Sequence, residues 1–250
     1  MKKINKLQSL LKNEHLDALA IVPGSNFFYL TGGNFHLLER PTVLLISKTN
    51  KPIAILPVLE VDSFEKLKLD VDIFEWQDSD GYQSAFDKAF QKIGSLSAIG
   101  IEGQRMRVFE SQAIEKAANK IKIINAHKLI SRIRLTKDHE EIEKLKKAID
   151  IAEKSLEKTL HYVEVGKTEI EIKNFLIQQL YNFGAEGIAF DPIVLASDNS
   201  ALPHGHSRND YKIRKGDCLL FDFGAIVDGY NSDITRTCLL YTSPSPRDRG

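Results

Sequence analysis

The chain has 250 residues, with 34 Lys plus Arg and 34 Asp plus Glu, so its formal net charge is zero. This balance argues against a nucleic-acid-binding protein, which usually carries a basic excess on one domain. The 42% of hydrophobic residues is ordinary for a globular protein, and no apolar run is long enough to span a membrane. The two cysteines allow no disulfide framework and no C-x-x-C zinc site, which favours a cytoplasmic location.

The first 130 residues alternate between helical and strand patterns. Residues 1–22 indicate an amphipathic helix that leads into a strand, because polar residues interrupt the apolar run that a signal peptide would need. Further helices are expected at 83–93 and 108–119. Strands alternating with helices predict an α/β domain over residues 1–130, with a largely parallel or mixed sheet. The expected strands are the short apolar runs at 16–22, 42–47, 52–57, 71–76, 97–102 and 121–125.

The pattern changes near residue 131, where an α+β domain is expected to begin. Residues 134–160 predict one long helix, because apolar side chains recur there at steps of three and four. A second helix is expected over 168–183, with Thr168 and Glu171 spaced as a capping box and Gly184 placed to end it. The apolar face of the long helix comprises Ile142, Leu145, Ala148, Ile149, Ala152, Leu156 and Leu160. The expected strands are 190–197, 216–227 and 230–237.

The dipeptide Asp228-Gly229 lies between the last two strands and is a strong signal for a two-residue hairpin turn. Such a turn places Asp222 opposite Thr235, and Asp233 becomes the diagonal neighbour of Asp222 on the same face. Diagonal neighbours have Cα atoms roughly 7–8 Å apart. Two metal ions about 3.5–4 Å apart fit between such carboxylates. The Thr235 hydroxyl could hold a ligand oxygen in orientation.

Two interpretations of this acid pair remain open on the spacing alone. Carboxylates within an otherwise apolar strand pair are costly to bury unless they are paired or bind metal, which favours a metal site. The alternative is a solvent-facing side of the sheet with two ordinary surface acids. These residues do not decide between the two interpretations.

Two longer segments resemble the pita-bread metallopeptidase family, and within it most closely the Xaa-Pro peptidases (prolidase and aminopeptidase P). They are YNFGAEGIAFDPIVLASDNSALPHG (181–205) and KGDCLLFDFGAIVDGYNSDITRT (215–237). NFFYLTGG (26–33) and RPTVLLIS (40–47) resemble the creatinase-type N-terminal domain of that family. The resemblance therefore implies such an α/β domain, followed by the first half of an α+β pita-bread domain over 131–237.

The resemblance also implies a site for two divalent metals, typically Mn, Co or Zn, held by two Asp, one His and two Glu. Asp222 matches the Asp that contacts one metal, and Asp233 matches the Asp that bridges both. His204, in the LPHG segment, matches a His that approaches the substrate and helps to stabilise the tetrahedral intermediate. The implied reaction is hydrolysis of proline-containing peptides by water that the metals activate, in an enzyme that is commonly a homodimer.

The family's remaining His and two Glu have no match in this sequence. Residues 238–250, CLLYTSPSPRDRG, depart from the family pattern and are expected to be a non-native tail, so the chain is interpreted as C-terminally truncated. With two of five ligands, it is expected to bind metal weakly or not at all and to lack peptidase activity. Two alternatives remain: a metal-free pita-bread protein that serves as an interaction module, and a creatinase-like amidinohydrolase.

Overall fold

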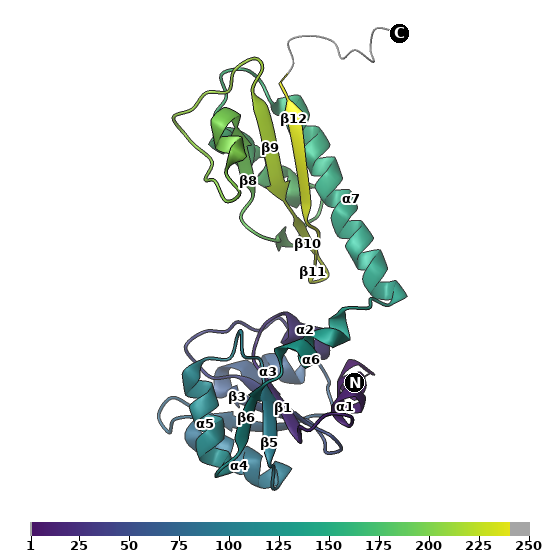
Figure 1. Cartoon of the computed structure of the whole chain (residues 1–250), viewed down its shortest axis with the longest axis vertical. Helices are drawn as coiled ribbons and strands as arrows, with labels where there is room; N and C mark the ends of the chain where they lie inside the picture. Colours follow the sequence, from purple (N-terminus) through teal and green to yellow (C-terminus); the bar gives the residue numbers. More distant parts are fainter. Residues whose placement is uncertain (1, 241–250) are drawn as a thin grey trace. The chain divides into compact units, whose positions relative to one another are not determined.

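The computed structural model describes residues 2–240. The chain forms two compact units, which divide between Thr136 and Lys137, whereas the sequence pattern changes near residue 131. A short 3-10 helix, η1 (Arg132–Arg134), lies between these two positions. Figure 1 shows the elements of each unit in the order of the chain. Among the described residues, no helix combines the length and the apolar composition that crossing a membrane requires.

The first unit is built on one six-stranded sheet with the order β4-β3-β2-β1-β5-β6. Pairing is parallel between β3 and β4 and along β1, β5 and β6, and antiparallel on both sides of β2. Each strand falls within one of the expected apolar runs, so the expectation of a mixed sheet is confirmed. The strands are β1 (Ala18–Ile21), β2 (Val43–Ser47), β3 (Ile53–Pro57), β4 (Asp72–Trp76), β5 (Ala98–Ile101) and β6 (Lys122–Asn125).

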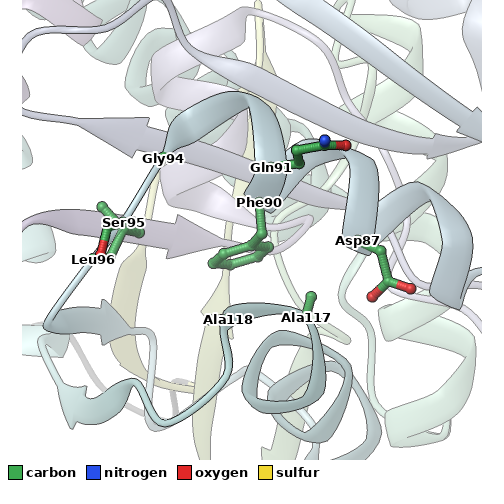
Figure 2. Close-up of a pocket in the computed structure, with 8 residues that line it drawn as sticks. All are labelled: Asp87, Phe90, Gln91, Gly94, Ser95, Leu96, Ala117 and Ala118. Carbon is green, nitrogen blue, oxygen red and sulfur yellow. The ribbon is translucent and has the colours of Figure 1, made fainter.

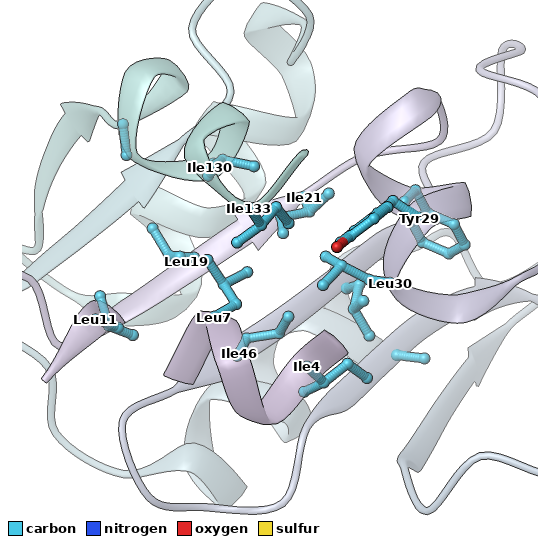
Figure 3. Close-up of a cluster of buried hydrophobic side chains, with 14 of the residues drawn as sticks. Ile4, Leu7, Leu11, Leu19, Ile21, Tyr29, Leu30, Ile46, Ile130 and Ile133 are labelled. Carbon is cyan, nitrogen blue, oxygen red and sulfur yellow. The ribbon is translucent and has the colours of Figure 1, made fainter. Parts of the chain in front are cut away.

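The core of the first unit lies on both faces of this sheet. Leu19 and Ile21 of the central strand belong to one buried cluster, where they meet Leu7 of α1 (Lys2–Leu11) (Figure 3). Ala18 and Ala20, which point the other way, belong to a second cluster that includes side chains of α4 (Gln83–Ile93) and α5 (Val108–Ala118). Burial on both faces explains why these strands are continuous apolar runs rather than alternating patterns.

The sequence pattern did not indicate three helices of this unit. They have seven, eight and five residues, respectively, which is shorter than the window over which helical periodicity can be recognised. They are α2 (Ser25–Thr31), α3 (Val58–Glu65) and α6 (His127–Ser131).

The second unit packs α7 (His139–Tyr162) and α8 (Glu169–Asn182) against two three-stranded sheets. The sheet orders are β12-β9-β8 and β11-β10-β7, and both helices share one buried cluster with these strands. The remaining elements are β7 (Gly187–Ile188), β8 (Ile193–Ala196), η2 (Ser197–Ala201), β9 (Cys218–Phe223), β10 (Ala225–Val227), β11 (Tyr230–Asn231) and β12 (Ile234–Leu239).

Helix α7 begins at its cap, Asp138, rather than at residue 134 as expected. The Asp138 carboxylate accepts a hydrogen bond from the Glu141 amide (2.9 Å), and the Glu141 carboxylate accepts one from the Asp138 amide (2.9 Å). This reciprocal pair satisfies two amide groups that the first turn of a helix leaves without partners. The capping box therefore fixes the start of the helix.

The buried face of α7 also differs from the expected one. Ile142, Ile149 and Leu160 are 40%, 41% and 39% exposed, whereas Ser155 and Thr159 are fully buried. Each of these two hydroxyls donates a 2.7 Å hydrogen bond to the carbonyl four residues earlier, so neither needs water. Because the hydroxyl groups are satisfied within the helix, two polar residues can occupy the core side that periodicity assigned to apolar ones.

Helix α8 has the ends that the sequence predicts. The Thr168 hydroxyl accepts a hydrogen bond from the Glu171 amide (3.2 Å), as in a capping box. Gly184 has φ +100° and lies just after the helix, where its amide donates to the Tyr181 carbonyl (3.0 Å). A glycine in the left-handed region is the usual end of a helix. Both expectations are confirmed.

Candidate metal centre

The hairpin turn expected at Asp228-Gly229 is present. Asp228 and Gly229 have φ +49° and +74°, as a type I′ turn requires at both central positions. Val227 pairs with Tyr230 across the turn. The turn therefore sets the register of everything that follows along both strands.

The same register continues into β9 and β12, where Asp222 pairs with Thr235, as expected. Strand β12 continues to Leu239, which pairs with Cys218, so it runs two residues beyond the expected end at 237. Of the predicted non-native tail, 238–250, the first residues are thus part of the sheet. Residues 241–250 lie outside the described part of the chain.

Gly224 separates β9 from β10, so the single strand expected over 216–227 is two strands. A Cβ atom at Gly224 would lie 1.9 Å from the Ser232 carbonyl oxygen and 2.9 Å from the Ala189 Cβ atom. Only glycine allows this close approach of two backbones. The Ser232 hydroxyl accepts a hydrogen bond from the Ala225 amide (2.9 Å), and the Ser232 amide donates to the Ala225 carbonyl (2.9 Å). The pairing register is therefore the same on both sides of the break.

Asp222 and Asp233 lie on one face of this hairpin. The Thr235 hydroxyl donates a 2.9 Å hydrogen bond to the Asp222 carboxylate, which shows that these two side chains share a face. Ser232 and Ile234 are buried while Asp233 and Thr235 are exposed, so Asp233 alternates onto the same face as Thr235. Asp222 itself is half-buried.

The donor set on this face fits hard divalent cations. The Asp222 carboxylate is half-buried and accepts the hydrogen bond from Thr235, and Asp233 is exposed. Carboxylate oxygens are ligands that suit Mn²⁺ and similar hard ions. Within residues 2–240, no cluster of three or more His, Cys, Asp or Glu side chains could hold a metal. Asp222 and Asp233 are thus a pair of carboxylates and not part of a larger cluster of such side chains within these residues.

The loop that carries His204 packs on the same side of the sheet. Ile193 and Leu195 of β8 pair with Asp222 and Leu220 of β9, and alternation places Leu195 on the face of Asp222. A Cβ atom at Gly205 would lie only 2.8 Å from a Leu195 methyl group, so the loop lies directly over that side chain. His204 is exposed. The loop backbone next to His204 therefore lies on the acid-bearing face of the sheet.

One buried acid near this loop was missed by the sequence analysis. Glu169 is fully buried at the first position of α8 and forms an ion pair with Arg208 (3.1 Å). A glutamate in the first turn of a helix is ordinary, because it interacts favourably with the helix dipole. No sequence signal therefore distinguished it from a surface acid.

One pocket of the first unit contains no comparable chemistry. Its volume is about 340 Å³, and it lies between the C-terminal parts of α4 and α5 (Figure 2). Asp87 is the one charged side chain that lines it. Binding sites usually contain several convergent polar groups, so this pocket is not a candidate for catalysis.

Each of the two units matches a known protein family. Residues 3–136 match the Creatinase/Prolidase N-terminal domain, and residues 143–249 match Metallopeptidase family M24. A prolidase from Thermococcus sibiricus is similar in structure, with a TM-score of 0.87 at 31% identity, over 99% of this chain and 66% of that one. For an Xaa-Pro dipeptidase from Bacillus anthracis, the TM-score is 0.83 at 29% identity, over 100% of this chain and 67% of that one.

An uncharacterized peptidase of Staphylococcus aureus (strain USA300) is 30% identical over 237 residues, which is 95% of this chain and 66% of the relative. The chain thus spans just under two thirds of the length of such relatives. The matches confirm a mixed α/β N-terminal domain followed by part of a pita-bread domain. The chain belongs to metallopeptidase family M24, and its first unit is the Creatinase/Prolidase N-terminal domain.

Proposed function

We propose that the chain is the first part of a two-metal Xaa-Pro peptidase, which hydrolyses the peptide bond preceding proline. The observation that carries this proposal is the pair of carboxylates, Asp222 and Asp233, on one open face of a hairpin whose register is fixed by its turn. The similarity to proteins named prolidase and Xaa-Pro dipeptidase supports the preference for proline.

Each residue of the face has a proposed role. Asp222 and Asp233 would hold Mn, Co or Zn, with Asp233 shared between two ions. Thr235 already donates to Asp222 and would keep that carboxylate from rotating away from the site. His204 would donate a hydrogen bond to the peptide oxygen as negative charge develops there. When bound, the metals would supply activation of the attacking water and neutralisation of that charge.

We further propose that the 250-residue chain does not hydrolyse peptides. Five metal ligands are expected, and this sequence matches two. Two carboxylates without an imidazole should bind divalent ions only weakly. In the purified chain with Mn²⁺ and an Xaa-Pro dipeptide, we expect no release of proline. Robust turnover that is abolished in Asp222→Asn would contradict this part of the proposal.

The peptidase proposal itself is tested with the natural gene. Reading the gene beyond the codon for Thr237 should reveal one His and two Glu in the family pattern. The encoded protein should cleave an Xaa-Pro dipeptide with Mn²⁺ and leave the matching Xaa-Ala dipeptide intact. Asp233→Asn should abolish cleavage, whereas Asp228→Asn, an exposed acid of the same hairpin, should not. A gene without those ligands would favour a metal-free interaction module, and cleavage of creatine instead of peptides would favour the amidinohydrolase.

A further inference from the structure

The loop between β8 and β9 leaves the sheet through a strained residue. Ser197 has φ +55°, a left-handed conformation that serine rarely adopts. Such a conformation persists only where the surroundings enforce it. Residues 197–208, which we call the His204 loop, include six exposed residues and only two buried ones, Asn199 and Gly205, so little apolar packing is available to hold them.

Glu169 joins the two ends of the His204 loop. At the first end, its carboxylate accepts hydrogen bonds from the Ala196 amide (2.7 Å) and from the Asn199 side-chain amide (2.9 Å). At the second end, it accepts from the Arg208 amide (2.6 Å) and from the Arg208 guanidinium (3.1 Å). Asn199 also donates to the His206 carbonyl (3.0 Å), which ties the middle of the loop to the same carboxylate.

Arg208, at the second end of the His204 loop, also contacts residues at the first end. Its guanidinium donates to the Ala196 carbonyl (3.0 Å) and pairs with Asp198 (3.2 Å), while its Cζ atom lies 4.3 Å from the centre of the Tyr211 ring. A buried carboxylate is costly unless its oxygens are satisfied, and here three neutral donors and one guanidinium cation surround it. Ser207 also links the two ends, since its hydroxyl donates to the Val194 carbonyl (2.9 Å) and accepts from the Val194 amide (3.3 Å), but Glu169 is the buried charged group at this closure.

We propose that Glu169 is the positioning residue of the His204 loop: together with Arg208 it closes residues 197–208, so that His204 is held above the sheet face that bears Asp222. Glu169 touches no reacting group and acts through the loop. The catalytic meaning of this arrangement rests on the proposed function. The order of the loop, however, can be measured without metal, peptide or activity.

The test uses the 250-residue chain with Glu169→Gln, which keeps the size of the side chain but turns an NH₂ group toward the donors. Hydrogen exchange of residues 197–208 should become about tenfold faster, because a tenfold change corresponds to roughly one lost charged hydrogen bond. The NMR signal of the His204 imidazole, assigned with His204→Gln, should shift or broaden. The His161 signal, from α7, should stay in place.

Three further variants separate positioning from general stability. Glu171→Gln removes a charge from the same helix end but leaves the loop contacts intact, so it should change neither readout. Leu176→Val weakens the core under α8 and should lower stability without changing the His204 signal. Arg208→Lys keeps the positive charge but loses the guanidinium fork, and it should reproduce the effect of Glu169→Gln in milder form.

The outcomes are distinct. If Glu169→Gln does not fold, Arg208→Lys gives the decision with the same two readouts. Unchanged loop exchange and an unchanged His204 signal in the folded variants would overturn the proposal. Equal changes in Leu176→Val would also overturn it, since they would show only a loss of stability. Failure of the peptidase proposal would appear instead in the cleavage assay, and it would leave these measurements untouched.

Discussion

The close approach of two backbones at Gly224 gives the sharpest prediction, for Gly224→Ala. The added Cβ atom would lie 1.9 Å from the Ser232 carbonyl oxygen, a backbone atom that cannot rotate away. Overpacking of this kind costs about 1–3 kcal/mol. Displacing Ser232 also weakens its hydrogen bonds with Ala225, which adds about 1 kcal/mol. We expect the second unit to lose about 2–4 kcal/mol in its free energy of unfolding.

The assay exploits the single tryptophan of the chain, Trp76, which lies in the first unit. The urea unfolding curve of the first unit, monitored by Trp76 fluorescence, should be the same in Gly224→Ala as in the unmodified chain. Hydrogen exchange of residues 216–239 should report the loss in the second unit, since the two units need separate probes. Gly187→Ala is the matched control, because its Cβ atom would meet only an Ile226 methyl group at an ordinary 3.5 Å. A loss below about 0.5 kcal/mol in Gly224→Ala, no larger than in the control, would refute the reasoning.

Three further changes have defined outcomes. Asp138→Ala removes the cap of α7 and should cost the second unit about 1 kcal/mol, measured by its exchange protection; no loss would contradict the capping role. Thr235→Val removes the hydrogen bond to Asp222 at an exposed position, so stability should change by less than about 0.5 kcal/mol while Mn²⁺ affinity falls. Asp17 accepts from the Ala98 and Ser97 amides, and these bonds lower the pKa of its carboxyl. Its stabilisation is therefore complete above the unfolded-state pKa and disappears as pH falls through the lower folded-state pKa. Asp17→Asn should lower the free energy of unfolding of the first unit at pH 7, measured by urea unfolding with Trp76 fluorescence. The difference in this free energy between variant and unmodified chain should shrink at acidic pH, and a difference independent of pH would exclude this explanation.

Local sequence signals were sufficient for much of the candidate site. The turn at Asp228-Gly229 has two left-handed positions that glycine and aspartate tolerate, and it alone determines that Asp222 faces Thr235. The six apolar runs of the first unit were recognisable because strands buried on both faces carry no polar interruptions.

The features that sequence reasoning missed depend on distant contacts. Glu169 resembles any acid at a helix start, and its partners lie 27 to 39 residues further along the chain. The break at Gly224 depends on Ser232, which approaches only after the hairpin has formed. Ser155 and Thr159 are polar, so helical periodicity of apolar residues does not assign them to the buried face of α7. Hydrogen bonds within the helix allow them to be buried there.

The central claim is that Asp222 and Asp233 face a common site for divalent ions. It is tested most directly by titrating Mn²⁺ into the isotope-labelled chain and following paramagnetic broadening of backbone NMR signals. We predict that the signals of Asp222, Asp233 and Thr235 broaden first, and that Asp222→Asn abolishes this while Asp228→Asn does not. Broadening that begins at other acids, or that persists in Asp222→Asn, would contradict the claim.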